Sequence, residues 1–267
     1  MSIRIRTLAS GSEANVLLAE FDGFRLLIDA GLSGKAILQM LAEEGIAPDS
    51  LQALLLTHEH IDHCKGLPQL MKSTDLPVYT TRGTFEGLAR HAFFARLPKE
   101  RFHLFRAGDS FELGRIRVKS LPVRHDTREP VAYRLEAGDF AFACVTDLGC
   151  YGRELTESLQ GLSAMVLEAN HNRRMLEAGP YPYPLKRRID GPEGHLSNED
   201  AGLFLEQLVN PRLRQVMLGH LSKVNNVPEL ALDTVERALK HVPGGEKIRL
   251  SAAPWTGFSE PMVFDGR

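Results

Sequence analysis

The sequence predicts an α/β protein in which two β-sheets pack face to face and helices cover their outer sides. Short apolar runs typical of strands occur in groups in both halves of the chain, and helical spacing is confined to isolated stretches between them. With 267 residues, of which 43% are hydrophobic, the chain is long enough to bury a large core. We therefore expect one domain spanning residues 1–267.

The N-terminal elements are the easiest to place. A helix over 34–44 follows from the helical spacing of Ile37, Met40 and Leu41 before Gly45. The apolar run 51–56 predicts a buried strand, and Leu67, Leu70 and Met71 predict a short helix after it. Three strands precede the first helix, at 3–8, 16–20 and 24–29.

The remaining elements continue the pattern. Strands are expected at 77–80, 111–113, 116–121, 132–136, 140–145, 164–167, 216–218 and 248–250. Helices are expected at 83–91, 199–208 and 229–239. The segment 172–193, rich in proline, tyrosine and basic residues, is unlike any core element.

Composition excludes several classes of protein. The formal charge of −2 and a pI near 6.6 give no overall attraction to nucleic acid, although a local basic patch stays possible. Three cysteines do not form a disulfide framework, and no apolar stretch approaches the roughly 20 residues of a membrane span. Because the N-terminus also lacks an apolar signal region, we expect a cytoplasmic protein without a membrane partner. The oligomeric state is not predicted.

The most informative motif follows the buried strand 51–56. It reads Thr57-His58-Glu59-His60-Ile61-Asp62-His63, so three imidazoles and an aspartate fall within six positions. Nitrogen and oxygen donors at this density suit one or two divalent ions such as Zn, Mn or Fe. A solvated histidine-rich turn is the alternative, but the preceding buried strand argues against it.

Further ligands should come from the ends of other strands. His125, Asp147 and His220 each follow an apolar run, where a side chain can be held rigidly at a sheet edge. Asp29, which ends 24–29, fits better as a carboxylate that orients a ligand histidine. His171 also follows a strand, but its role stays open. Structural roles are expected for His91, His103 and His241.

Taken in order, Asp29, the His58–His63 motif, His125, Asp147 and His220 resemble the successive motifs of the metallo-β-lactamase superfamily. The resemblance covers nearly the whole chain and implies an αββα four-layer sandwich with two divalent metals at one edge of the sheets. It implies that His58, His60 and His125 hold one metal and that Asp62, His63 and His220 hold the other. Asp147 would bridge the two metals.

Other residues indicate the branch of this superfamily. Glu168-Ala169-Asn170 and 194–201, with His195, resemble the paired glutamate and histidine motifs of RNase Z. Ser197 or Asn198 could instead simply cap the helix that begins near Glu199. Still longer stretches resemble the YycJ/WalJ (VicX) group of bacterial proteins, which implies 5′ to 3′ exonuclease activity on DNA. Those stretches are 8–12, 27–34, 167–171, 185–189, 194–202 and 220–226.

These residues predict metal-assisted hydrolysis of a phosphodiester. Asp62 would bind a metal and accept a proton from the attacking water, while Glu168 would orient His195 as the proton donor to the leaving oxygen. Three alternatives stay open: a cyclic phosphodiesterase or thioesterase acting on small molecules, a binding protein without activity, and RNA as the substrate.

The segment 172–193 has two interpretations of about equal weight. In the first, it binds nucleic acid, with basic side chains on phosphates and Tyr181 and Tyr183 stacking on bases. In the second, it is a solvated loop held by prolines. The basic side chains concerned are Arg173, Arg174, Lys186, Arg187 and Arg188.

Overall fold

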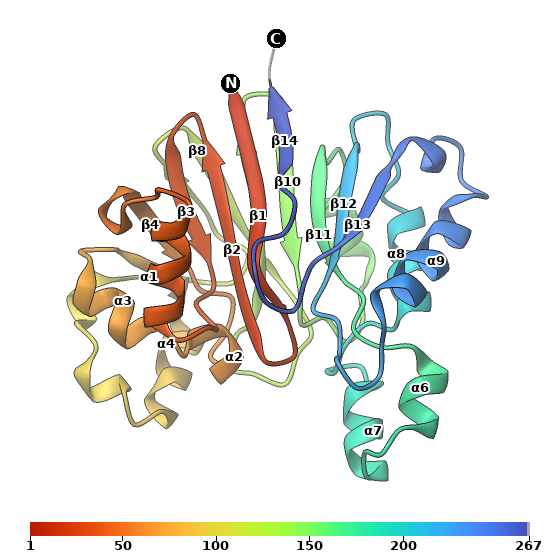
Figure 1. The fold of residues 1–267 in the computed structure, drawn as a ribbon, viewed down its shortest axis with the longest axis horizontal. Coiled ribbons are helices and arrows are strands. Elements are labelled where there is room, and N and C mark those ends of the chain that lie inside the picture. The colour runs from red at the N-terminus through yellow and green to blue at the C-terminus, as the bar shows by residue number, and fades with distance from the viewer. Residues whose placement is uncertain (266–267) are drawn as a thin grey trace.

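Two mixed sheets of seven strands each pack face to face, with helices on both outer sides, in the computed structural model, which describes residues 1–265 (Figure 1). The predicted αββα sandwich is therefore confirmed. No helix within residues 1–265 is both long and apolar enough to cross a membrane.

The two sheets have the same internal plan. In each, four neighbouring strands are antiparallel and the pairs that follow are parallel. The first sheet has the order β14 (Met262–Asp265), β1 (Ser2–Gly11), β2 (Ala14–Phe21), β3 (Phe24–Ile28), β4 (Leu51–Leu55), β5 (Val78–Thr81), β6 (Phe102–Phe105). The second has the order β13 (Arg249–Ala252), β12 (Gln215–Gly219), β11 (Ala164–Glu168), β10 (Phe140–Val145), β9 (Val131–Ala137), β8 (Ile116–Pro122), β7 (Ser110–Leu113).

Helices cover the outer sides of both sheets. In Figure 1, α1, α3 and α4 lie beside the first sheet, α8 and α9 lie beside the second, and α6 and α7 project below it. The helices are α1 (Gly34–Glu43), α2 (Ile61–Cys64), α3 (Leu67–Ser73), α4 (Arg82–Gly87), α5 (Arg153–Ser158), α6 (Arg173–Ala178), α7 (Tyr183–Ile189), α8 (Asn198–Glu206) and α9 (Pro228–Leu239).

Three apolar layers hold these elements together. Alternation along β3 shows how they form, because Leu26 and Ile28 face the second sheet while Leu27 packs with the outer helices. Phe142 is fully buried between the sheets, and its truncation to alanine would cost about 3–5 kcal/mol. The third layer joins the second sheet to α8 through residues such as Phe204.

Caps and glycines explain where several helices start and stop. The Ser33 side chain accepts a hydrogen bond from the Ala36 N–H at the start of α1, and Gly45, just beyond its end, has a φ of 68°. The short helix predicted around Leu67 is α3, and α2 precedes it. A Cβ on Gly66 would lie 2.6 Å from the Leu32 carbonyl oxygen, so the chain needs glycine where these two helices meet.

Several elements differ from those predicted from the sequence. The helix expected over 83–91 ends at Gly87 and continues only as a short 3-10 turn, so His91 lies outside it. The interpretation of 172–193 as a loop is wrong, because the segment forms α6 and α7. The Asn172 side chain caps the start of α6, and Pro182 is the N-cap residue of α7. Strands β6 and β14 and helix α5 were not expected. These are short elements with little periodicity of their own.

Candidate metal centre

The histidine motif begins where β4 ends, and Asp29 fixes its first residue. The Asp29 carboxylate accepts hydrogen bonds from the Thr57 backbone N at 2.8 Å and from Thr57 Oγ1 at 2.9 Å. Its Oδ2 also accepts a hydrogen bond from His63 Nδ1 at 2.8 Å. This contact leaves His63 Nε2 facing the centre of the site. Asp29 therefore has the role that we expected for it, a carboxylate that orients a ligand histidine.

Three of the expected site residues adopt left-handed backbone conformations. Asp29, Asp147 and His220 have φ values of 62°, 57° and 54°, and each lies just after a strand: β3, β10 and β12 respectively. Such conformations are strained for residues with a Cβ and are typical of functional positions. Spacing along the sequence cannot reveal them.

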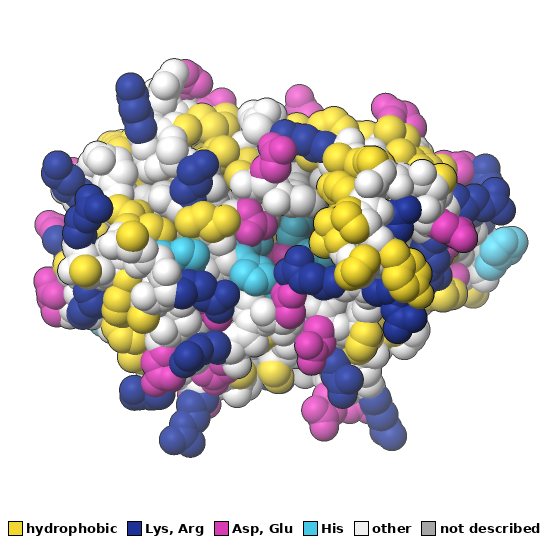
Figure 2. All heavy atoms as spheres, turned by 90° about the horizontal axis from the view of Figure 1, so that it is seen from below, with side chains coloured by type: hydrophobic (Ala, Val, Ile, Leu, Met, Phe, Trp, Pro, Cys, Tyr) yellow, Lys and Arg dark blue, Asp and Glu magenta, His cyan; other side chains and the backbone are white. Residues whose placement is uncertain are grey.

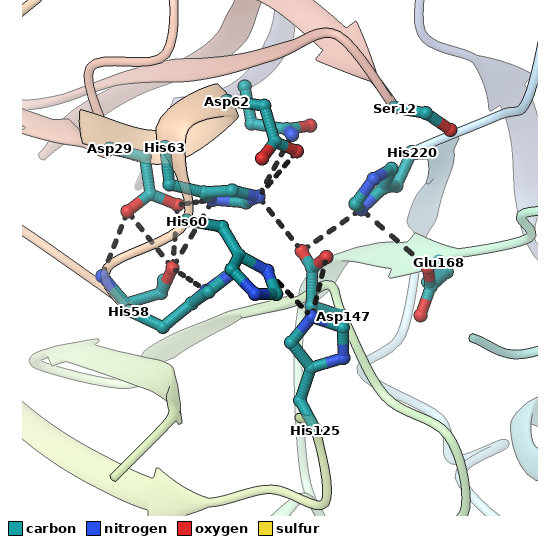
Figure 3. A network of polar contacts seen from close by, with 12 residues as sticks. Ser12, Asp29, His58, His60, Asp62, His63, His125, Asp147, Glu168 and His220 are labelled. Carbon is teal, nitrogen blue, oxygen red and sulfur yellow. Dashed lines mark hydrogen bonds and ion pairs between the residues drawn. The ribbon is translucent and has the colours of Figure 1, made fainter. Parts of the chain in front are cut away.

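The expected ligands come together in two groups (Figure 3). The first contains His58, His60 and His125, and the second contains Asp62, His63, Asp147 and His220; within each, the candidate ligand atoms lie within 4.8 Å of one another.

Asp147 stands between these groups. Its Oδ1 is 3.6 Å from His125 Nε2, and its Oδ2 is 3.1 Å from His63 Nε2 and 3.0 Å from His220 Nδ1. One carboxylate therefore contacts members of both groups, the arrangement that the family pattern implied for a bridging ligand.

The donor set fits divalent metal ions. His58 Nε2 is a buried polar atom without a hydrogen-bond partner within residues 1–265, and the buried atoms Asp147 Oδ2 and His220 Nδ1 contact only other candidate ligands there. Buried polar atoms rarely lack partners, and imidazole and carboxylate groups that converge in this way are typical metal ligands.

Charge within the site supports the same conclusion. Burial lowers the pKa of His58 well below its usual value, and burial together with His125 lowers the pKa of His60 to about 4, so both rings are neutral, as metal ligands must be. Burial alone would raise the pKa of Asp147, but His220 and His63 outweigh it and hold this pKa well below its usual value. Against the effect of burial, Asp147 in turn raises the pKa of His63 and raises the pKa of His220 to about 9, so these rings carry the positive charge beside the carboxylate, and a bound metal would supply it in their place.

A second pair of residues lies beside the ligands. His195 Nδ1 is 2.7 Å from Glu168 Oε1, and Glu168 Oε2 accepts a hydrogen bond from the Leu148 N–H at 2.7 Å. Glu168 is fully buried at the end of β11, whereas the His195 side chain is 16% exposed. Ser197 does cap α8, so the capping role and the Glu168–His195 pair coexist. Glu168 and His195 also form a four-residue group with Asp147 and His220 that could hold a metal. Measuring the metal content of Glu168 and His195 variants separates the role of proton donor from that of metal ligand.

Sequence reasoning missed residues that support the ligands. The Gly194 carbonyl oxygen is 3.1 Å from His125 Nδ1 and fixes that ring. Asn15 Nδ2 is 3.0 Å from His63 Nε2. Asp126 Oδ1 is 3.4 Å from His125 Nε2. The only sequence feature that could have indicated Asp126 is its position directly after the expected ligand His125. His171, whose role was open, contacts Asp190 at the end of α7 with 3.2 Å between Nε2 and Oδ1.

The five basic residues of 172–193 fall into two classes. Arg173 pairs with Asp190 and Asp200, and Arg188 pairs with Asp126. Lys186 donates to the Glu177 carbonyl oxygen. Arg174 and Arg187 are exposed and make no side-chain hydrogen bond or ion pair with any described residue.

A cavity of about 710 Å³ lies between α6 and α7. Arg173, Leu176, Tyr183, Lys186 and Arg187 are among its lining residues. Figure 2 shows the face below the sheets, where histidine side chains lie in a hollow between basic and hydrophobic groups.

Comparison with known proteins places this architecture in a family. A family model described as "Beta-lactamase superfamily domain" matches residues 24–221. Exodeoxyribonuclease YycJ of Bacillus anthracis is 36% identical over 240 residues, which cover 90% of each protein. Exodeoxyribonuclease WalJ of Streptococcus pneumoniae is 36% identical over 232 residues, covering 87% of this chain and 86% of the relative.

Solved structures agree on the fold. The metallo-β-lactamase fold protein YhfI of Bacillus subtilis has a TM-score of 0.71 at 16% identity and covers all of both chains. Zn²⁺-bound PqqB of Methylobacterium extorquens has a TM-score of 0.73 at 18% identity, covering 98% of this chain and 99% of the other. The chain belongs to the metallo-β-lactamase superfamily of hydrolases and, within it, to the family that includes the YycJ and WalJ exodeoxyribonucleases.

Proposed function

We propose that this protein is a dinuclear metal-dependent phosphodiesterase that acts as a 5′ to 3′ exonuclease on DNA. The observation that carries the proposal is the Glu168–His195 pair, placed beside two groups of metal-ligating residues. Its relatives in Bacillus anthracis and Streptococcus pneumoniae, both named exodeoxyribonucleases, support DNA as the substrate.

The ligand groups have distinct assignments in this proposal. His58, His60 and His125 would hold one ion, and Asp62, His63 and His220 would hold the second; Asp147, which contacts His125 and His63, would serve both groups. Zn, Mn and Fe all suit this set of nitrogen and oxygen donors. When bound, such ions lower the pKa of water and stabilise negative charge on phosphoryl oxygens.

The protein's own side chains move the protons. In this proposal Asp62, at the start of α2 and among the ligands of the second group, accepts the proton of the attacking water. His195 donates a proton to the oxygen that leaves, and Glu168 accepts a hydrogen bond from its Nδ1–H, so the transferred proton is the one on Nε2. Because the Leu148 N–H fixes Glu168, the ring is oriented before substrate binds.

The substrate strand would continue over α6 and α7. The unpaired guanidinium groups of Arg174 and Arg187, with Lys186 beside the cavity, suit phosphates. Arg173 and Arg188 lie on the same helices but are held in ion pairs, so they would contact phosphates only if those pairs opened. Tyr183 is 70% exposed and offers a ring for base stacking. The cavity volume lies within the range of small-molecule sites and accommodates a nucleotide.

End-labelled nucleic acids test this function directly. The metal-loaded protein, with Mn²⁺ or Zn²⁺, is incubated with DNA and RNA labelled at the 5′ or the 3′ end, in single- and double-stranded form. We expect DNA labelled at the 5′ end to release mononucleotide first, and chelation of the metal to stop the reaction. Faster release from the 3′ end would contradict the polarity, and preference for RNA would contradict the substrate. Hydrolysis of small esters without action on either nucleic acid would favour a small-molecule hydrolase.

A further inference from the structure

Asn15 lies among the ligands but has no role in the mechanism above. It follows the turn between β1 and β2, and only 5% of its surface is exposed. Its Oδ1 accepts a hydrogen bond from the Gly11 N–H at 3.1 Å, and its Nδ2 donates to the Gly11 carbonyl oxygen at 3.0 Å. These two contacts fix the orientation of the amide, since exchanging oxygen and nitrogen would break both.

The second N–H of Asn15 points at His63. Asn15 Nδ2 is 3.0 Å from His63 Nε2, the ring nitrogen that faces Asp147. Nε2 can accept this hydrogen bond only while its lone pair is free. A metal ion held by Nε2 would leave the Asn15 N–H without an acceptor, although it stays buried and directed into the site.

The surrounding structure keeps this N–H in place. The Ser10 Oγ accepts a hydrogen bond from the His220 N–H at 2.9 Å, so the β1–β2 turn is joined to both His63 and His220. The Gly31 N–H donates to the Asn15 carbonyl oxygen at 2.9 Å. A Cβ on Gly31 would lie 1.6 Å from the Asp62 carbonyl oxygen and 2.6 Å from the Asn15 backbone N, so Gly31 is packed tightly between Asn15 and the turn that carries Asp62.

We propose that Asn15 donates this N–H to a non-bridging oxygen of the scissile phosphate. The inference rests on the proposed phosphodiesterase function and adds a residue that contacts the reacting group. An anionic phosphoryl oxygen is the acceptor that enters this site during the reaction, and a fixed neutral donor stabilises the charge that grows on it. An aspartate at this position would repel the same oxygen.

This role predicts a particular dependence on substrate. DNA and bis(4-nitrophenyl) phosphate both have non-bridging oxygens, but of these two substrates only DNA has a leaving group that needs protonation. Asn15→Ala should therefore reduce turnover of DNA and of bis(4-nitrophenyl) phosphate by a similar factor, on the order of 10²-fold, as for the loss of one oxyanion donor. A proton donor such as His195 would instead affect mainly DNA.

The test compares Asn15→Ala, Asn15→Asp and the control Asn210→Ala in metal-loaded protein. Asn15→Asp keeps an acceptor for the Gly11 N–H but loses the donor. Asn210 donates to two carbonyl oxygens, those of Leu162 and Leu208, and precedes β12, whereas His220 follows the other end of that strand. Metal content, thermal unfolding, turnover of both substrates and the affinity for inorganic phosphate are measured for each protein.

We expect both Asn15 variants to retain their metals, to lose turnover equally on the two substrates and to bind inorganic phosphate at least about tenfold more weakly. Asn210→Ala should match the wild type in all but unfolding temperature. Unchanged phosphate affinity, a loss confined to DNA, or a loss of metal that accounts for the lost turnover would each overturn the role of Asn15. If the wild type hydrolyses neither substrate, the phosphodiesterase function fails instead, and the phosphate titration still tests Asn15.

Discussion

The metal centre and the α6–α7 segment contribute to one surface in very different ways. The ligands are mostly buried, come from strand ends in both sheets, and are held by contacts such as that between Asp29 and His63. Helices α6 and α7 are short and exposed, and several of their basic side chains pair with acidic neighbours. A change in the first region should therefore alter metal content or the chemical step, whereas a change in the second should alter binding and its dependence on salt.

The largest effect is expected for Asp147→Ala. Because Asp147 contacts members of both ligand groups, this change should reduce metal occupancy in both and lower activity by more than about 10³-fold. Elemental analysis of the purified protein measures occupancy. Asp22→Ala is a matched control, since Asp22 also has a positive φ but lies in the β2–β3 turn and contacts Ser2. A variant that keeps both metals would remove the bridging role of Asp147.

His195→Ala should cost less and should distinguish between substrates. A DNA alkoxide leaves with difficulty, so loss of the proton donor should reduce turnover of DNA on the order of 10²-fold or more. Nitrophenolate is stable without protonation, so bis(4-nitrophenyl) phosphate should be affected much less. Glu168→Gln should give the same pattern more weakly, because it orients the donor.

Controls for this comparison are a metal analysis of both variants and the surface variant His241→Ala. Equal losses on both substrates with intact metals would show that His195 is not the general acid. Lost metal would instead make His195 or Glu168 a ligand, in agreement with their distances to Asp147 and His220.

The sequence predicted the metal centre better than the hairpin of α6 and α7 for a physical reason. Metal ligands need specific side chains at strand ends, so His58, His125 and Asp147 are visible as donors that follow apolar runs. Nothing in such patterns encodes the left-handed backbone of Asp147 or the contact from Asn15, because both depend on how distant segments meet. Exposed short helices bury few side chains, so α6 and α7 lack the periodicity that identified α1 and α9.

DNA binding by the hairpin of α6 and α7 should depend on salt concentration rather than on metal content. If Arg174 and Arg187 contact phosphates, replacing both with alanine should weaken binding of single-stranded DNA and reduce the slope of log K against log salt by about 1.4. Turnover of bis(4-nitrophenyl) phosphate should be unchanged. Arg115→Ala is the control, because Arg115 is an exposed arginine in the β7–β8 turn, beside Gly23 and Gln52. An unaltered salt slope would mean that the hairpin does not bind the substrate through these charges.

The smallest effect is expected for Arg173→Ala, which separates structural from substrate-binding arginines within the same hairpin. Arg173 contacts Asp190 Oδ1 at 3.5 Å and Asp200 Oδ2 at 2.6 Å, and Asp190 in turn contacts His171. These groups are partly exposed, so the loss should reduce the free energy of unfolding by no more than about 1 kcal/mol. While both carboxylates hold Arg173, its charge is not free for a phosphate, and the salt slope should stay that of the wild type. A slope reduced by about 0.7 would show that Arg173 leaves its ion pairs to bind the strand, as Arg174 and Arg187 are expected to do without that cost.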